Sequence, residues 1–207
     1  MHAPDAVLPS LAEMNEGITF RQRWATFLTI GLTGTALLGG LLLRSSVEGA
    51  TQLFVDSATG IAARYPDGWL LERGAPDSDF VFRVEDPTAL SFKTTLSVAI
   101  EPVGPNATVY DVAELLTLKQ AQTLAAYHYL GLAPTQLPNG TAATQLNYVY
   151  ASSAADPFLA SIPVVVRADD VIVLSHGQAI IVSYQADAQS YDANQRYFTA
   201  FLRTLSF

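Results

Sequence analysis

The three histidines are the side chains of this sequence best suited to proton transfer or metal binding near neutral pH, and they lie far apart, at His2, His128 and His176. None belongs to an HExxH sequence, the spacing that places two histidines around a zinc ion on one helix face. The chain has no cysteine, which excludes a cysteine nucleophile, a cysteine zinc site, a disulfide and a lipid-modified cysteine. We therefore expect no metal site.

Nucleophilic catalysis and nucleotide binding also lack their usual signals. No G-x-S-x-G elbow surrounds a serine. No phosphate-binding G-x-x-x-x-G-K-[ST] loop or dinucleotide fingerprint occurs. A Ser-His-Asp triad is recognised by geometry rather than by spacing, so one built on His128 or His176 stays open at this point. We expect a protein that is not an enzyme and holds no cofactor.

Acidic residues are paired at three places, and carboxylate oxygens are the ligands that Ca²⁺ prefers. The pairs are Asp77 with Asp79, Glu85 with Asp86, and Asp169 with Asp170. None has the spacing of an EF-hand loop, so we interpret all three as solvated turns. In particular, Ala168-Asp169-Asp170 is predicted to be a turn joining a strand at 164–167 to a strand at 171–174.

Residues 24–43 form an uninterrupted run of twenty residues without a charge. A helix of that length spans roughly 30 Å, the thickness of a bilayer core. Arg21 and Arg23 precede the run, Arg44 follows it, and Trp24 stands where an interfacial aromatic is expected. The sequence therefore predicts a transmembrane helix at 24–43.

A cleaved signal peptide is the rival interpretation of this run. Signal peptides have an apolar region of about 7–15 residues and small residues before the cleavage site. Here the run is longer and follows a leader with three acidic residues. Cleavage after Gly49 would place Val47 at the third position before the cut, so the alternative stays open. The length favours an uncleaved anchor.

The balance of arginines predicts the orientation of the anchor, because the more basic flank stays in the cytoplasm. Residues 1–23 are then a cytoplasmic tail, 44–50 a stalk, and 51–207 a domain on the extracytoplasmic side of the cell membrane. Residues 1–44 hold equal numbers of acids and bases, so the net charge of −8 belongs to the remainder. An acidic chain repels phosphate, which argues against nucleic acid as a partner.

Small residues line one face of the predicted anchor. Gly31, Thr35 and Gly39 recur every four residues, and Ala36 and Gly40 lie beside them. This spacing lets a second helix approach closely in lipid. We interpret the stripe as a helix-packing surface, with the ordinary composition of membrane spans as the alternative.

The domain at 51–207 has the pattern of an α+β fold. Alternating apolar residues predict strands around 82, 98, 148 and 182, and a hairpin is predicted over 51–65. Thr108 and Asp111 form a loose capping box that begins a helix, which Gly131 and Pro134 are expected to end, so that His128 lies in the helix. A last helix begins near Ser190. Consecutive strands with short turns imply an antiparallel sheet, whose faces the helices cover.

The order of these parts carries a resemblance to a known family. An early strand runs into Tyr65-Pro66-x-x-Trp69, and a helix occupies the middle of the domain. Gly177 then leads through a strand to Ser183-Tyr184, to Tyr191-Asp192, and to a last helix that ends in Ser206-Phe207. The domain resembles the PsbP-like superfamily, which includes the extrinsic lumenal subunit of photosystem II, bacterial relatives and a eukaryotic Ran-binding protein.

The resemblance implies a compact α-β-α sandwich and a non-catalytic role. It implies an accessory or assembly subunit that stabilises a photosynthetic or respiratory electron-transfer complex, with integral membrane subunits and the bilayer as partners. The anchor departs from the soluble extrinsic subunit, which argues against the photosystem II assignment itself. No cofactor or metal residue is carried over, because no matching motif is present.

Two further features bear on function. Phe158 and Leu159 end a loop and are candidates for docking, with a place in the core at the start of the next strand as the alternative. Tyr148, Tyr150 and Tyr184 are candidates to line a ligand pocket. An alternative function is therefore a membrane-tethered ligand-binding or sensing domain, and a third is a tethered hydrolase.

Overall fold

The computed structural model describes residues 20–75, 78–89, 91–153 and 162–207, with only the backbone described at 20–23 and 41–48. The chain divides into two units, Met1–Gly49 and Ala50–Phe207. The first unit contains helix α1 (Phe20–Glu48), which includes the predicted anchor segment. Among the described residues, no helix combines the length and the apolar character needed to span a bilayer. The anchor therefore stays a prediction.

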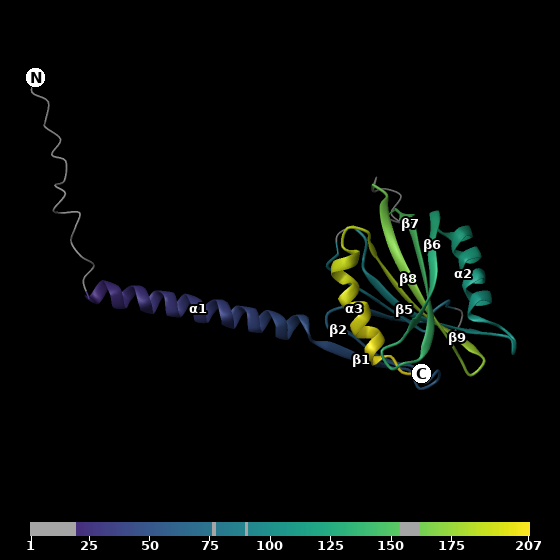
Figure 1. The fold of residues 1–207 in the computed structure, drawn as a ribbon, viewed down its shortest axis with the longest axis horizontal. Helices are drawn as coiled ribbons and strands as arrows, with labels where there is room; N and C mark the ends of the chain where they lie inside the picture. Colours follow the sequence, from purple (N-terminus) through teal and green to yellow (C-terminus); the bar gives the residue numbers. More distant parts are fainter. Residues whose placement is uncertain (1–19, 76–77, 90, 154–161) are drawn as a thin grey trace, which may run out of the picture. The chain divides into compact units, whose positions relative to one another are not determined.

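The second unit consists of nine strands and two helices among its described residues (Figure 1). Their bounds are β1 Thr51–Val55, β2 Ala62–Pro66, β3 Leu70–Arg73, β4 Phe82–Glu85, β5 Thr95–Pro102, α2 Val109–Thr123, β6 Ala125–Gln136, β7 Ala142–Ser152, β8 Val164–Ser175, β9 Gln178–Asp187 and α3 Tyr191–Thr204.

Seven strands form one antiparallel sheet in the order β3-β4-β5-β9-β8-β7-β6, and β1 and β2 form a separate hairpin. Helices α2 and α3 lie on opposite faces of the sheet (Figure 1). The predicted α+β architecture with an antiparallel sheet is confirmed. The short β8–β9 turn requires left-handed backbone at His176 and Gly177, with φ of 51° and 75°, which matches the twist of the two strands.

The sheet separates two apolar cores, because successive side chains along a strand point to opposite faces. The core under α3 contains Leu96, Val98, Val182 and Tyr184. The core under α2 contains Leu146, Tyr148, Ala168 and Ile181, with others. The alternation predicted for these strands is therefore present, and the central strands β8 and β9 contribute to both layers.

Helix α2 begins as predicted but ends earlier. The Thr108 N–H donates to Asp111 Oδ2 at 2.7 Å, and the Asp111 N–H donates to Thr108 Oγ1 at 3.3 Å, which completes the capping box. The helix ends at Thr123 rather than near Gly131, and β6 follows at once. The prediction that His128 is helical was wrong, because pairing of β6 with β7 outweighs an apolar pattern that suits either element.

The predicted turn at Ala168-Asp169-Asp170 is also wrong. Strand β8 runs without interruption from Val164 to Ser175 between β7 and β9. Asp169 and Asp170 are each only 1% exposed. Two adjacent acids are typical of a solvated turn in sequence, so their burial in a central strand requires hydrogen-bond partners that only the tertiary structure supplies.

Candidate functional site

The two buried acids of β8 point to opposite faces of the sheet. Asp169 contacts Tyr191 and Asn147 through hydrogen bonds, and Tyr191 belongs to the core under α3. Asp170 accepts a hydrogen bond from Gln120 of α2. The strand period of two therefore places one carboxyl in each layer, where the two have different surroundings.

Asp169 has a complete set of partners. It accepts hydrogen bonds from the Asn147 amide and from the Tyr191 hydroxyl. Tyr184 donates to the Tyr191 carbonyl at 2.6 Å, and the Arg167 guanidinium lies 4.0 Å from the centre of the Tyr191 ring. Burial raises the pKa of Tyr191, and the bond to Asp169 raises it further. This arrangement holds α3 against the sheet and gives each Asp169 oxygen a donor, while Arg167 Nε is buried without a hydrogen-bond partner among the described residues.

Asp170 is less completely satisfied. Gln120 Nε2 donates to Asp170 Oδ2 at 2.6 Å. Among the described residues, Asp170 Oδ1 and Gln120 Oε1 lack a hydrogen-bond partner of ordinary geometry. Burial raises the pKa of Asp170 to about 6, although the nearby Ser183 hydroxyl, Gln120 and the Tyr148 hydroxyl favour the charged form.

Asp170 ends a row of polar side chains that crosses four strands. The antiparallel register places Arg83 of β4 opposite Ser97 of β5, Ser97 opposite Ser183 of β9, and Ser183 opposite Asp170. All four line a hollow of about 450 Å³ between α2 and the sheet. The row leads from partly exposed Arg83 to a buried carboxyl, which is the arrangement expected of a site that orients a polar group.

Aromatic side chains form one wall of this hollow. Tyr148 and Tyr150 lie with ring centres 6.3 Å apart, and Phe92 meets Tyr150 edge-on at 6.4 Å. The Tyr150 hydroxyl donates to Gln185 at 2.9 Å. Burial raises the pKa of Tyr150 to about 12, and the charge of Asp170 also raises it. Of the three tyrosines predicted to line a pocket, Tyr184 belongs instead to the opposite core.

The cationic side chains of the hollow already have partners. Arg83 pairs with Glu72 at 2.6 Å and with Glu85 at 3.5 Å. Lys119 pairs with Asp79 at 3.1 Å and with Glu101 at 3.9 Å. Within the part of the chain that the structure describes, Asp170 is therefore the charged lining group that has no ion pair.

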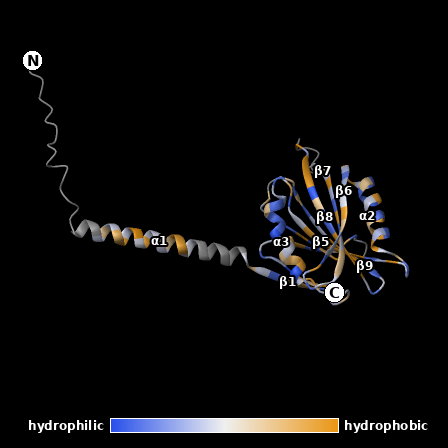
Figure 2. Cartoon of the chain, in the orientation of Figure 1, coloured by the Kyte–Doolittle hydropathy of each residue, from blue (hydrophilic) through white to orange (hydrophobic). Residues whose placement is uncertain are grey.

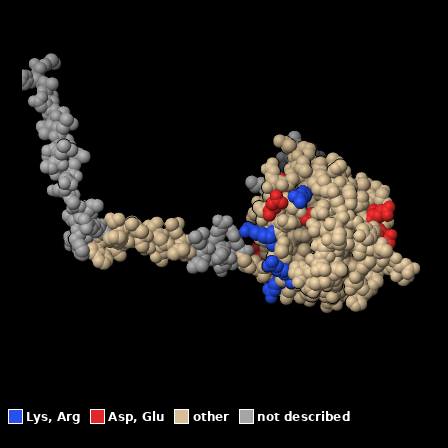
Figure 3. All heavy atoms as spheres, in the orientation of Figure 1, with Lys and Arg blue, Asp and Glu red and all other residues tan. Residues whose placement is uncertain are grey.

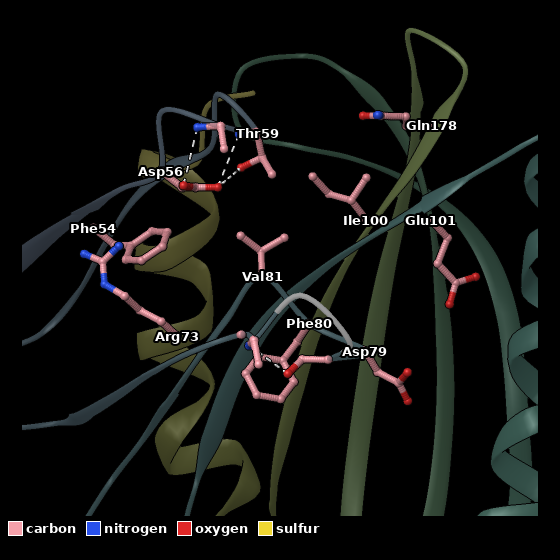
Figure 4. Close-up of a pocket in the computed structure, with 14 residues that line it drawn as sticks. Phe54, Asp56, Thr59, Arg73, Asp79, Phe80, Val81, Ile100, Glu101 and Gln178 are labelled. Carbon is pink, nitrogen blue, oxygen red and sulfur yellow. Dashed lines mark hydrogen bonds between the residues drawn. The ribbon is translucent and has the colours of Figure 1, made fainter.

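A second hollow, of about 640 Å³, lies beside the β1–β2 hairpin (Figure 4). Several of its polar groups already have partners, within the hollow or outside it. Asp56 accepts from the Thr59 hydroxyl at 2.6 Å and from the Ala58 and Thr59 amides, and the bond from the Thr59 hydroxyl is the main cause of its lowered pKa. Arg73 lies 4.8 Å from the centre of the Phe54 ring. We therefore regard the Asp170 hollow as the candidate site.

The histidines do not meet at a site. His128 is exposed on the edge strand β6, and His176 accepts or donates one hydrogen bond, at 2.8 Å, with the Ser175 hydroxyl in an exposed turn. Among the described residues, neither histidine forms an ion pair with a carboxylate, and no cluster of three or more metal-ligating side chains is found. His2 lies outside the described residues.

The remaining predicted residues fall on α1 or outside the described residues. Gly31 and Thr35 share a face of α1, because the Thr35 hydroxyl donates to the Gly31 carbonyl at 2.8 Å. A Cβ added at Gly39 or Gly40 would meet no atom within 4 Å, and Ala36 is exposed. Phe158 and Leu159 lie outside the described residues.

The other acidic pairs are solvated, as predicted, wherever they are described. Glu85 is partly exposed and pairs with Arg83, and Asp86 accepts from Thr88 in a turn. Asp79 is exposed and pairs with Lys119. Asp77 lies outside the described residues. Sequence reasoning missed Asp170 because the signal for it is weak: two acids inside a continuous apolar run.

Solved structures resemble this chain over about three quarters of its length, 76% in each of the two cases below. No family model matches the chain. No curated relative matches it either. The solution structure of cyanobacterial PsbP from Synechocystis sp. PCC 6803 is 15% identical, with a TM-score of 0.54 over 76% of this chain and 92% of that one. The fold is PsbP-like. LpqN, involved in cell envelope biogenesis of Mycobacterium tuberculosis, is 13% identical, with a TM-score of 0.51 over 76% of this chain and 90% of that one.

Proposed function

We propose that this protein is a non-catalytic, single-span accessory subunit of a larger membrane complex, with its PsbP-like domain docked on integral subunits at the extracytoplasmic face. The observation that carries the proposal is the outer face of α2. Tyr110, Leu115 and Leu118 are 65%, 64% and 54% exposed there. We call these three residues the α2 outer face.

The α2 outer face is unusual for a helix at the surface of a free domain. The opposite side of α2 already buries Val112, Ala113 and Leu116 against the sheet, so the helix carries large apolar side chains on its exposed side as well, interleaved there with Asp111 and Glu114. A surface helix normally presents charged and polar residues to water. Figure 2 colours α2 with both hydrophobic and hydrophilic residues, and Figure 3 shows long stretches of one face of the domain free of charge, with acidic atoms at the edge where α2 lies. Exposed apolar groups of this kind favour a protein partner.

The uncharged segment supports the membrane part of the proposal. It would hold the domain at the membrane surface, where integral subunits are the partners within reach. In lipid, the stripe of Gly31, Thr35 and Gly39, with Ala36 and Gly40 beside it, would let a partner helix approach closely. Two contact surfaces on one chain, one in the bilayer and one outside, reinforce each other because the second contact becomes intramolecular.

The choice of complex rests on resemblance. The PsbP-like pattern supports a photosynthetic or respiratory electron-transfer complex. The same fold occurs in a protein involved in cell envelope biogenesis, so the fold is compatible with more than one kind of assembly. We propose the electron-transfer assignment as the first to test.

A second candidate function is a tethered ligand-binding or sensing domain. The observation that favours it is Asp170, a buried carboxyl that lines a hollow and has an oxygen without a hydrogen-bond partner among the described residues. Buried polar groups without partners are rare in structural cores and frequent where a ligand or an ordered water completes the set.

The absence of cysteine makes the proposed topology directly testable. Single cysteines would be introduced at Ala3, in the tail, and at Asn106, an exposed loop residue of the domain. In intact cells, a membrane-impermeant maleimide should label Asn106→Cys and leave Ala3→Cys unlabelled until the cells are lysed. The reverse pattern, or release of the domain into the soluble fraction, would contradict the anchored orientation.

A further inference from the structure

We propose that the hollow between α2 and the sheet binds a small organic cation, an ammonium group on an aromatic or apolar body, with Asp170 as its counter-ion. This inference rests on the second candidate function, the binding of a ligand in this hollow. It adds the chemical class of the ligand and the residues that recognise it.

Charge is the first argument for a cation. Four acids line the hollow, Asp79, Glu85, Glu101 and Asp170, against two bases. Both bases, Arg83 and Lys119, are already held by the other acids. The lining therefore has an excess of two negative charges, and Asp170 is the one lining acid without an ion pair among the described residues. A ligand that brings a positive charge to it completes an ion pair shielded from water, where such a pair is stronger than at the surface.

Hydrogen bonding is the second argument. Asp170 Oδ1 and Gln120 Oε1 are both acceptors, and neither has a hydrogen-bond partner of ordinary geometry among the described residues, although the Ser183 and Tyr148 hydroxyls lie near Asp170. An ammonium group carries three N–H donors and no acceptor, so one group can donate to both Asp170 oxygens once Gln120 has turned away. A ligand group that has acceptors only would leave Asp170 Oδ1 unsatisfied.

The aromatic wall is the third argument. Tyr148, Tyr150 and Phe92 line the same hollow as Asp170. Burial raises the pKa values of Tyr148 and Tyr150, and the charge of Asp170, which lines the same hollow, raises them further. Aromatic faces attract cations, and they also provide the apolar contact that a hydrocarbon body needs.

Gln120 determines access to the carboxylate. Its Nε2 lies 2.6 Å from Asp170 Oδ2, so an amide donor occupies the position that an ammonium would take. Because Asp170 is only 1% exposed, a ligand reaches it after the Gln120 side chain turns away. Gln120 is partly exposed and lines the hollow, so a change of its side-chain rotamer toward solvent would uncover the carboxylate.

Phenethylammonium is a suitable probe, and 2-phenylethanol is its uncharged counterpart of nearly the same shape. Each would be added at 20 mM to the full-length chain in detergent at pH 8, where Asp170 is ionised because its pKa is about 6. The unfolding midpoint would be followed by tryptophan fluorescence of a Trp24→Phe background, in which Trp69, packed against the core under α3, is the remaining tryptophan. Sodium chloride would equalise the ionic strength.

The proposal predicts that phenethylammonium raises the midpoint by about 3 °C or more if the dissociation constant is near one-tenth of the concentration used. The alcohol should raise it by less than a third of that value. Asp170→Asn should abolish the difference between the two probes, whereas Gln120→Ala, which uncovers the carboxylate, should keep or enlarge it.

Two results would overturn the inference. If Asp170→Asn keeps the full response to phenethylammonium, or if neither probe raises the midpoint of the wild-type chain, Asp170 is not a counter-ion for this class of ligand. If the alcohol stabilises as much as the amine, the cation is rejected while the hollow remains a ligand site. The accessory-subunit proposal is unaffected by any of these results, which keeps the two failures distinguishable.

Discussion

Asp170→Asn is expected to stabilise the unit Ala50–Phe207 at pH 8 by up to about 3 kcal/mol. This figure is the free-energy equivalent of the raised pKa of Asp170. Burial raises the pKa of Asp170 from 3.8 to about 6 in the folded chain. The folded state therefore holds its proton more tightly than the unfolded state. Stability falls as the pH rises from about 4 to about 6, and the loss persists above that range. Asparagine removes the charge and keeps an oxygen that accepts from Gln120.

The measurement is urea unfolding of the full-length chain at several pH values between 4 and 8. The gain from Asp170→Asn should be small at pH 4 and reach its maximum above pH 6, so that the curve for the variant is flatter than that for the wild type. Glu114→Gln, at an exposed acid of α2, is the matched control and should follow the wild type. A variant that is less stable than the wild type at pH 8 would contradict the assignment of Asp170 as a buried, unpaired carboxyl.

Asp169→Ala is expected to have the opposite sign and to destabilise the domain by about 3–5 kcal/mol. The substitution removes the carboxylate that accepts from the Tyr191 hydroxyl and from the Asn147 amide. Both donors then lose their acceptor inside the folded domain. Each buried donor without an acceptor costs about 1–3 kcal/mol. The loss also frees the Tyr191 ring, against which Arg167 stacks and which links α3 to the sheet.

Urea unfolding at pH 7 measures this loss, with Tyr191→Phe as the milder comparison. That variant keeps the ring and leaves Asn147 bonded to Asp169, so it should cost only about 1–2 kcal/mol. The contrast between neighbouring acids is the informative result. If Asp169→Ala and Asp170→Asn change stability in the same direction, the two carboxyls do not have the separate surroundings described here.

The sequence was informative where a pattern is local. Alternation placed the strand cores at Leu96 and Val98, and the capping box at Thr108 placed the start of α2, because both depend on residues a few positions apart. The end of α2 was not predictable in the same way. Residues 124–131 are apolar enough for either a helix or a strand, and the pairing of β6 with β7 decides between them.

At the candidate site too, residues with a local sequence pattern were predictable and residues held by tertiary contacts were not. Tyr148 and Tyr150 were singled out correctly because they alternate on one strand face. Asp170 was assigned to a turn, because two adjacent acids rarely enter a central strand. What stabilises them there comes from Gln120, fifty positions away, and from Tyr191, on another helix. Those contacts depend on the tertiary arrangement and have no local sequence signature.

The accessory-subunit function is tested most directly by identifying the proteins that remain bound to the full-length chain after purification in a mild detergent. Mass spectrometry would compare the wild type with Leu115→Asp/Leu118→Asp and with Gly31→Leu/Gly39→Leu. A surface control on α3 and the turn before it, Gln189→Asp/Gln195→Asp, adds two acids at exposed positions away from α2.

We expect the same integral membrane proteins with the wild type and the control, and at least a tenfold loss of them with each of the two interface variants. All variants should remain in the membrane fraction and unfold at similar midpoints, so that the loss reports docking rather than folding. A wild-type chain that purifies without an integral partner, or a Leu115→Asp/Leu118→Asp variant that keeps its partners in full, would contradict the accessory-subunit function.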